Sequence, residues 1–255
     1  MITDTLSLQI MIGVLIGLSA GYLGSFMILK RMSLVGDVIS HVALPGIAIA
    51  LLFEVNPFFG AFGALFLAIL GIWLLERKTE IPSETLVGIF FALSLALGIL
   101  ITPEPELLEA LFGDITGIAR PDVIITAVLT AIMLIIMAKI QRGLTLSVIS
   151  RELAQSAGIN ISWTGFLFLF LVAIVVALGL KVTGTFLMGA LVIVPAAAAK
   201  NISVNLKSYT LLSGFFGAIS GLAGILIANY FNLHPGPIVV LTSGIIFLAT
   251  LIFKR

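Results

Sequence analysis

Residues Trp163–Leu180 read WTGFLFLFLVAIVVALGL and include no Asp, Glu, Lys or Arg. At ~1.5 Å per residue, a helix of this length comes close to crossing the ~30 Å hydrocarbon core of a bilayer. An uninterrupted apolar run of this length is typical of a transmembrane helix and not of a helix at the surface of a soluble domain.

The rest of the chain has the same character. Hydrophobic residues make up 60% of its 255 positions and charged residues 10%, and its mean hydropathy is +1.27. These values exclude a soluble protein and make the lipid bilayer the surroundings of the whole chain. The 13 Lys and Arg residues are scattered and form no basic patch, so we expect no nucleic-acid partner. Because the sequence has no cysteine, disulfides and iron–sulfur clusters are excluded.

Nine apolar segments approach the length of a membrane span. We therefore predict an all-α integral membrane protein, a polytopic bundle of about nine transmembrane helices that forms a single domain over residues 1–255. The seventh segment is short, and if it only dips into the membrane the number of spans is eight. The segments are Leu8–Leu29, Leu34–Phe53, Phe58–Leu75, Leu86–Ile101, Val123–Ala138, Trp163–Leu180, Phe186–Ala199, Leu211–Phe231 and Ile238–Phe253.

The distribution of Lys and Arg predicts the orientation of these helices. With the N-terminus outside and the C-terminus inside, only Arg120 and Lys181 fall on the external side, as the positive-inside rule favours. Most acidic residues fall on the external side in this orientation, where they either concentrate cations or are simply solvated. The internal basic residues are then Lys30, Arg31, Arg77, Lys78, Lys139, Arg142, Arg151, Lys200, Lys207, Lys254 and Arg255, and the external acidic residues are Asp4, Glu54, Glu104, Glu106, Glu109, Asp114 and Asp122.

Small residues four apart permit close contact between helices in lipid. Gly13, Gly17 and Gly21 form one such stripe, and Gly217 and Gly221 form another. We expect both stripes to be packing faces.

Asp37 and His41 are the strongest local anomaly, within the stretch GDVISHVALPG at positions 36–46. A carboxylate within or near hydrocarbon is costly unless it is paired, hydrated or bound to a cation. Four residues apart on a helix, the two side chains lie ~5–6 Å from each other on one face and can converge on one metal ion. In a two-fold dimer the pair doubles, which gives enough ligands for four-coordinate zinc or part of a manganese shell.

Other interpretations of these residues stay open. Asp37 and His41 can instead pair with each other, or Asp37 can be an acidic charge at the start of a helix. Pro45 and Gly46 predict a kink or an unwound turn, which in membranes often faces a cavity but can also serve packing alone. His234 is the other histidine, either a further metal ligand on the external side or a solvated loop residue.

The longest internal connection contains SRELAQSAGI at positions 150–159. This segment is amphipathic and too polar to cross the membrane, so it predicts a short helix at the membrane surface. The helix is either a docking site for a partner or an ordinary interfacial helix. The sequence has no G-x-x-x-x-G-K-[ST] loop and no H-E-x-x-H motif, so we expect neither an ATPase site nor an enzyme activity of its own.

Four stretches resemble the metal-type permeases of bacterial ABC importers, which carry manganese, zinc or iron. They are GYLG at 21–24 with LKRMSLVGDVISHVALPG at 29–46, LFGD at 111–114, RELAQSAG at 151–158, and VTGTFLMGALVIVPAAAA at 182–199. In the last of these, Ala198 stands where the family pattern leads us to expect Thr. The resemblance covers nearly the whole chain.

The resemblance implies roles for particular residues. Asp37 and His41 would contact the ion, with His234 a weaker candidate. Apart from the resemblance, Pro45, Gly46 and Pro195 are candidate positions for helix kinks that gate the path. The segment near 150–159 would be a cytoplasmic coupling helix that fits a groove on the ATPase subunit through Arg151, Glu152, Ala154 and Gly158.

The resemblance also implies partners and a location. The permease would be a homodimer in the prokaryotic cytoplasmic (inner) membrane, with separate ATPase subunits inside and an extracellular or periplasmic metal-binding protein outside. No cofactor would be bound permanently, because the divalent metal ion is the transported substrate and ATP is bound by the partner subunit.

We therefore expect the permease subunit of an ATP-driven ABC importer for divalent manganese, zinc or iron. A mixed oxygen and nitrogen site suits all three ions. One alternative is an ABC permease for a chelated metal or vitamin, whose wide passage needs no ligating side chains. Another is a gradient-driven secondary metal transporter, which needs no docking helix.

Overall fold

The computed structural model describes residues 2–79, 81–101 and 117–253, and within these ranges every regular element is a helix. The LFGD stretch at 111–114 lies outside the described residues. In chain order the helices are α1 (Ile2–Leu29), α2 (Val35–Val42), α3 (Leu44–Leu52), α4 (Pro57–Lys78), α5 (Ser83–Ile101), α7 (Arg120–Ile149), α8 (Arg151–Ser156), α9 (Ile161–Ile202), α10 (Leu206–Phe231) and α11 (Pro235–Ile252).

Eight segments of the described chain are long and apolar enough to cross a membrane, with α2 and α3 together forming one of them. The segment expected as the seventh span is the second part of α9, the shorter apolar helix Leu187–Ile202. At ~1.5 Å per residue, its sixteen residues reach only about 24 Å. The prediction of an all-α membrane protein with eight to nine spans is confirmed.

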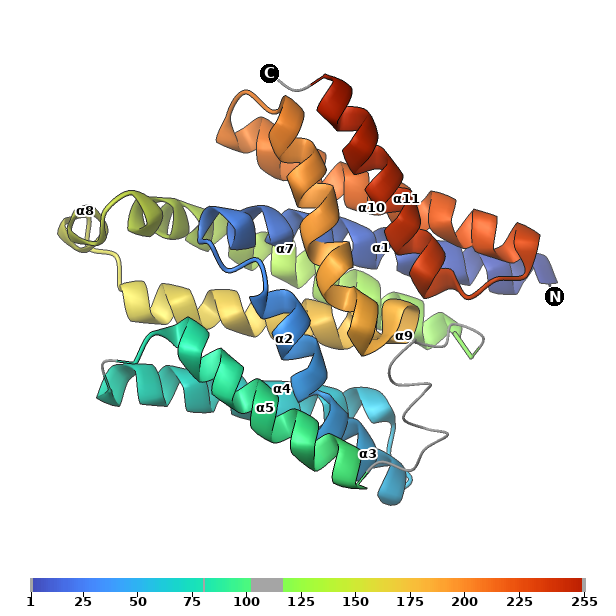
Figure 1. The fold of residues 1–255 in the computed structure, drawn as a ribbon, viewed down its shortest axis with the longest axis horizontal. Coiled ribbons are helices and arrows are strands. Elements are labelled where there is room, and N and C mark those ends of the chain that lie inside the picture. The colour runs from blue at the N-terminus through green and yellow to red at the C-terminus, as the bar shows by residue number, and fades with distance from the viewer. Residues whose placement is uncertain (1, 80, 102–116, 254–255) are drawn as a thin grey trace.

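The helix ends gather at two opposite ends of the molecule (Figure 1). One end holds α8, the end of α1, and the α4–α5 and α9–α10 connections, while the N-terminus and the α10–α11 connection lie at the other end. Basic residues occupy the last turns of α4 and α9, at Arg77, Lys78 and Lys200, and Arg151 begins α8. The basic ends of α4 and α9 and the basic start of α8 therefore lie at the end of the molecule that carries α8.

Helices α1 and α10 pack against each other through their glycines. A Cβ atom on Gly17 would overlap the carbonyl group of Gly217, and one on Gly221 would overlap the carbonyl group of Gly13. Only glycine permits this backbone approach, so the prediction that these stripes are packing faces is confirmed.

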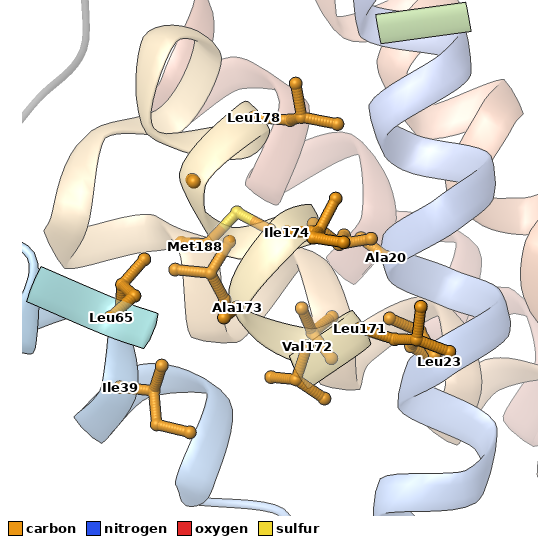
Figure 2. Packing of buried hydrophobic residues seen from close by; sticks show 14 of the residues in the cluster. Ala20, Leu23, Ile39, Leu65, Leu171, Val172, Ala173, Ile174, Leu178 and Met188 are labelled. Carbon is orange, nitrogen blue, oxygen red and sulfur yellow. The ribbon is translucent and has the colours of Figure 1, made fainter. Parts of the chain in front are cut away.

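The first part of α9 lies in the middle of the hydrophobic core. Figure 2 shows its side chains from Leu171 to Leu178 between Ala20 and Leu23 of α1 on one side and Ile39 of α2 and Leu65 of α4 on the other. A helix covered on all sides by apolar neighbours reads as a continuous apolar run, which explains the part of the stretch from Leu171 to Leu180.

Helix α9 is broken at Gly184, where φ is 67° and ψ is −177°. A positive φ of this size favours glycine, because a Cβ atom would clash with the backbone. After the break, the second part of α9 turns back at an angle toward the α8 end of the molecule (Figure 1). The backbone at Pro195 stays helical, so Gly184 and not Pro195 sets the change of direction.

Candidate metal-transport site

Helix α2 carries Asp37 in its first turn and His41 in its last turn. The helix ends at Val42 because Pro45 has no N–H with which to continue the ladder of backbone hydrogen bonds. The Ala43 N–H instead donates back to the carbonyl oxygen of Ser40 at 3.3 Å, and α3 starts at the next residue. The short α2 is therefore a separate element that presents an acid and an imidazole one turn apart.

The ring of His41 is buried, with 8% of the residue exposed. It packs edge-on against Phe91 of α5, with ring centres 5.4 Å apart and planes at 87°. Its Nδ1 atom lies 3.0 Å from the backbone carbonyl oxygen of Asp37. Because a carbonyl oxygen can only accept, this contact puts a proton on Nδ1, and the lone pair of the neutral ring is then on Nε2.

The backbone of Asp37 is held against the second part of α9. A Cβ atom on Gly189 would lie 2.7 Å from the Cα atom of Asp37, so the two backbones are as close as a glycine allows. The carboxylate is half-buried and forms no ion pair with any described residue. The charge of Asp37 therefore lies in a largely apolar bundle without a cationic partner among the residues described.

Ser40 ties α2 to the break in α9. Its hydroxyl oxygen lies 2.6 Å from the carbonyl oxygen of Asp37 and 2.7 Å from that of Thr185, and it can donate to either. The Thr185 hydroxyl is fully buried and has no hydrogen-bond partner within the described chain. No role was predicted for Ser40 or Thr185, although a glycine between two threonines inside an apolar run, at Gly184, was a usable signal.

His234 lies apart from this pair. It is exposed and takes the N-cap position of α11, a helix that packs on α9 and α10. Over the described ranges, no three His, Cys, Asp or Glu side chains come close enough together to hold a metal ion. The structure thus brings Asp37 and His41 together on one short helix and leaves His234 on the α10–α11 connection.

Comparison with known proteins identifies the family. The model of the ABC 3 transport family matches residues 3–254. The chain belongs to the ABC 3 transport family. The resemblance noted in the sequence is therefore confirmed.

Two curated relatives align along most of this ABC 3 family chain. It is 32% identical to the manganese transport system membrane protein MntC of Listeria monocytogenes, over 94% of this chain and 87% of that protein. It is also 32% identical to the high-affinity zinc uptake system membrane protein ZnuB of Haemophilus influenzae, over 95% of each. A solved structure, PsaBC from Streptococcus pneumoniae in complex with Fab, matches with a TM-score of 0.84 and 31% identity, over 98% of this chain and 95% of that one.

Helix α8 of this ABC 3 family chain is short, exposed and well capped. The Ser150 hydroxyl accepts a hydrogen bond from the Leu153 N–H at 3.2 Å and donates one to a carboxylate oxygen of Glu152 at 2.6 Å. The second bond favours the ionised carboxylate, so it holds the pKa of Glu152 below its usual value. Arg151 and Glu152 both point their charges to solvent.

The other end of α8 is fixed by Ala154 and Gly158. Ala154 is fully buried and its carbonyl oxygen accepts from the Ile159 N–H at 3.0 Å. Gly158 has a φ of 74°, the left-handed conformation that commonly ends a helix. The four residues expected to form a coupling helix therefore belong to one capped, largely exposed turn at an end of the molecule.

Proposed function

We propose that this chain is the permease subunit of an ATP-driven importer and that Asp37 and His41 bind a divalent transition-metal ion during its passage. The observation that carries the proposal is a buried imidazole and a half-buried carboxylate on one short helix, fixed in place by Ser40 and Gly189. A mixed oxygen and nitrogen ligand set suits manganese, zinc and iron. Relatives named for manganese and zinc transport support this class of substrate.

The arrangement of His41 favours a metal ligand. The carbonyl oxygen of Asp37 holds the Nδ1–H, and in metal sites a second hydrogen bond of this kind orients the ring and fixes the tautomer. Nε2 is then the nitrogen that binds the ion, beside the carboxylate of Asp37. Two ligands from one chain make a weak site, which lets a transported ion leave again.

We propose that a homodimer completes the ligand set. Two copies would bring two Asp37 and two His41 side chains to the interface, enough for four-coordination. Helix α5 supports this arrangement, because it packs on α2 and only 17% of its membrane-spanning window is buried in one chain. Its exposed face includes Leu93 and Leu97.

Helix α8 is the proposed contact with a separate ATPase subunit inside the cell. The charges of Arg151 and Glu152 are exposed there on a turn that begins at the capping residue Ser150 and ends at Gly158. ATP would be bound and hydrolysed by that partner, so the permease would need no enzyme activity of its own. A displacement of α8 would be transmitted to α9, which follows it in the chain. The break in α9 at Gly184 lies beside Ser40 and the proposed ion site.

The breaks in α2–α3 and α9 are the proposed gating elements. Pro45 causes the first break, and Gly46 lets α3 approach the carbonyl group of Gly60 in α4. Pro195 lies in the part of α9 that must move with Gly189 if the path opens.

The proposed orientation has the N-terminus outside the cytoplasmic membrane of a prokaryote. The gathering of basic helix ends beside α8 supports an internal position for that end of the molecule. The opposite end, with His234, would then receive the ion from an external metal-binding protein.

The proposal is tested by cellular accumulation of manganese, zinc and iron in cells that carry this permease with its neighbouring partner genes. Asp37→Asn and His41→Ala should each abolish accumulation of one and the same metal, because each removes one ligand. Glu76→Gln is the matched control, since Glu76 is an exposed acid at the end of α4, outside α2 and outside the external acidic set, and it should accumulate metal as the wild type does.

Other outcomes distinguish the alternatives. Unchanged accumulation of all three metals in both variants would remove the pair from the path and favour a permease for chelated substrates. Transport that survives deletion of the ATPase gene would instead point to a gradient-driven transporter.

A further inference from the structure

A cleft of about 280 Å³ lies between α7 and α9 at the base of α8. Lys139 and Arg142 line it from α7, and Asn160, Trp163 and Thr164 line it from the start of α9. None of its lining residues is acidic. The cleft therefore carries two positive charges between two membrane-spanning helices, on the side that the proposed orientation makes cytoplasmic.

The two basic side chains are not neutralised by the protein. Lys139 and Arg142 are both exposed, and neither forms an ion pair with a residue that the structure describes. The backbone N–H groups of the first turn of α9, which follows its N-cap Asn160, add partial positive charge on the same side of the cleft. An anionic group is the chemical class that fits these surroundings.

An apolar track on α7 leads directly to the cleft. Val128, Ile132 and Ile135 are 51%, 41% and 58% exposed, and with Lys139 and Arg142 they repeat every three or four residues. Residues at this spacing share one face of a helix. An acyl chain lying along these side chains would place the headgroup of its lipid beside Lys139 and Arg142.

Trp163 marks the level of the membrane surface at the same place. It is half exposed at the start of the first span of α9 and stacks on Phe166, with ring centres 5.3 Å apart. Tryptophan at the end of a span is typical of the interface between headgroups and hydrocarbon. The cleft therefore lies at headgroup depth.

We propose that this cleft binds the phosphate headgroup of an anionic phospholipid, with one acyl chain along the exposed face of α7. Basic pockets between membrane helices on the cytoplasmic side are suited to such headgroups. Ala157 and Ile159, which follow α8, also line the cleft, so a bound lipid would touch the segment that connects α8 to α9. The site is separate from Asp37 and His41 and does not depend on the transported ion.

Native mass spectrometry of the full purified chain tests the proposal, with phosphatidylglycerol and phosphatidylcholine of identical acyl chains offered at equal concentration. The wild type should retain phosphatidylglycerol at least about tenfold more tightly, since two basic residues near an anionic headgroup together contribute roughly thirtyfold. Equal retention of the two lipids by the wild type would overturn the proposal without any variant.

Two double variants locate the site. Lys139→Gln with Arg142→Gln should lose most of the preference, roughly tenfold or more, by the same estimate of charge contribution. Lys200→Gln with Lys207→Gln removes the same charge from exposed positions outside the cleft and should keep the preference. Equal loss in both double variants would show a diffuse charge effect and contradict a site in the cleft.

A soluble competitor separates the lipid from free phosphate. Inorganic phosphate at the concentration of the lipid should leave phosphatidylglycerol bound, because it lacks the acyl chain that contacts α7. Displacement of the lipid by phosphate at that concentration would mean that the cleft takes a soluble anion, and the proposal would be wrong.

Discussion

Asp37 and His41 are held by different contacts, and this makes their geometry testable residue by residue. The ring of His41 is fixed by Phe91 and by a backbone carbonyl oxygen, while Asp37 is fixed through its own backbone by Gly189. The position of the carboxylate therefore depends on how closely α9 approaches α2.

Gly189→Ala should push α2 away from α9. Its new Cβ atom would lie 2.7 Å from the Cα atom of Asp37, and relieving such an overlap costs ~1–3 kcal/mol of stability. We expect a lower thermal unfolding temperature and loss of metal accumulation. Gly165→Ala, earlier in the same helix, meets no atom within 4 Å and should unfold at or above the wild-type temperature. If the two variants unfold alike, the close approach at Gly189 is not what fixes Asp37.

Ser40→Ala should weaken the contact between α2 and the break in α9. The change removes the hydroxyl that is within donating distance of the buried carbonyl oxygen of Thr185, at a cost of about 1 kcal/mol in the free energy of unfolding. Ser147→Ala is matched, because the Ser147 hydroxyl also bonds to the carbonyl group three residues earlier, at 2.7 Å, but reaches no second helix. Chemical denaturation measures both, and equal destabilisation would argue against the Ser40 link.

Residue spacing predicted the acid and the imidazole but not the residues that hold them. Asp37 and His41 are four apart, so a helix alone puts them on one face. Ser40 and Thr185 are separated by 145 positions, and only the packing of α2 on α9 brings them together. The glycine between two threonines draws attention to Thr185, but a single sequence does not indicate which distant residue it contacts.

If α8 couples the permease to an ATPase subunit, as proposed above, the conformation at the end of α8 matters most for that coupling. Gly158→Ala puts a Cβ atom on a residue with a φ of 74°, which costs ~1–2 kcal/mol. We expect reduced ATP-driven uptake with unchanged metal binding, because the change is confined to the end of α8. Gly244 in α11 has no positive φ, and a Cβ atom there would meet no neighbour within 4 Å. Gly244→Ala should therefore take up metal as the wild type does. Loss of metal binding in Gly158→Ala would contradict a purely coupling role.

The helices themselves were predictable, while their breaks were predictable only in part. Long apolar runs fix the spans because the bilayer thickness sets their length. Pro45 predicted the break after α2, because proline has no N–H to donate to a helical hydrogen bond. The break in α9 depends on the positive φ of Gly184, whereas the predicted kink position in this helix was Pro195, around which the backbone remains helical.

At the scale of the whole molecule, the proposed orientation predicts which connections face outward. The native chain has no cysteine, so single cysteines introduced at exposed positions report their own side of the membrane. In intact cells, a membrane-impermeant maleimide should label Leu233→Cys between α10 and α11 and should not label Ser156→Cys in α8 or Val204→Cys after α9.

Val204→Cys carries most of the information in that experiment. Val204 lies on the same side of the membrane as α8 only if the short helix Leu187–Ile202 crosses the membrane. Protection of Val204→Cys from the external maleimide would therefore establish nine crossings. Labelling of Val204→Cys from outside, with Ser156→Cys still protected, would show that this helix returns to the outer face and that the number is eight.

Composition and charge fixed the class of the molecule and a consistent orientation, but not the arrangement of its helices. The central place of α9, between α1 on one side and α2 and α4 on the other, follows from three-dimensional packing of similar apolar surfaces (Figure 2). Runs of Leu, Ile, Val and Phe are chemically alike, so their sequences do not specify which helix meets which.

The most direct test of the central claim is X-ray absorption at the metal edge of the purified permease loaded with zinc. Wild type should give a mixed oxygen and nitrogen first shell with an imidazole signature and a zinc–nitrogen distance of ~2.0–2.1 Å. His41→Gln should lose the imidazole signature, and His234→Gln should retain it. An imidazole signature that persists in His41→Gln would contradict the assignment of the ion path to Asp37 and His41.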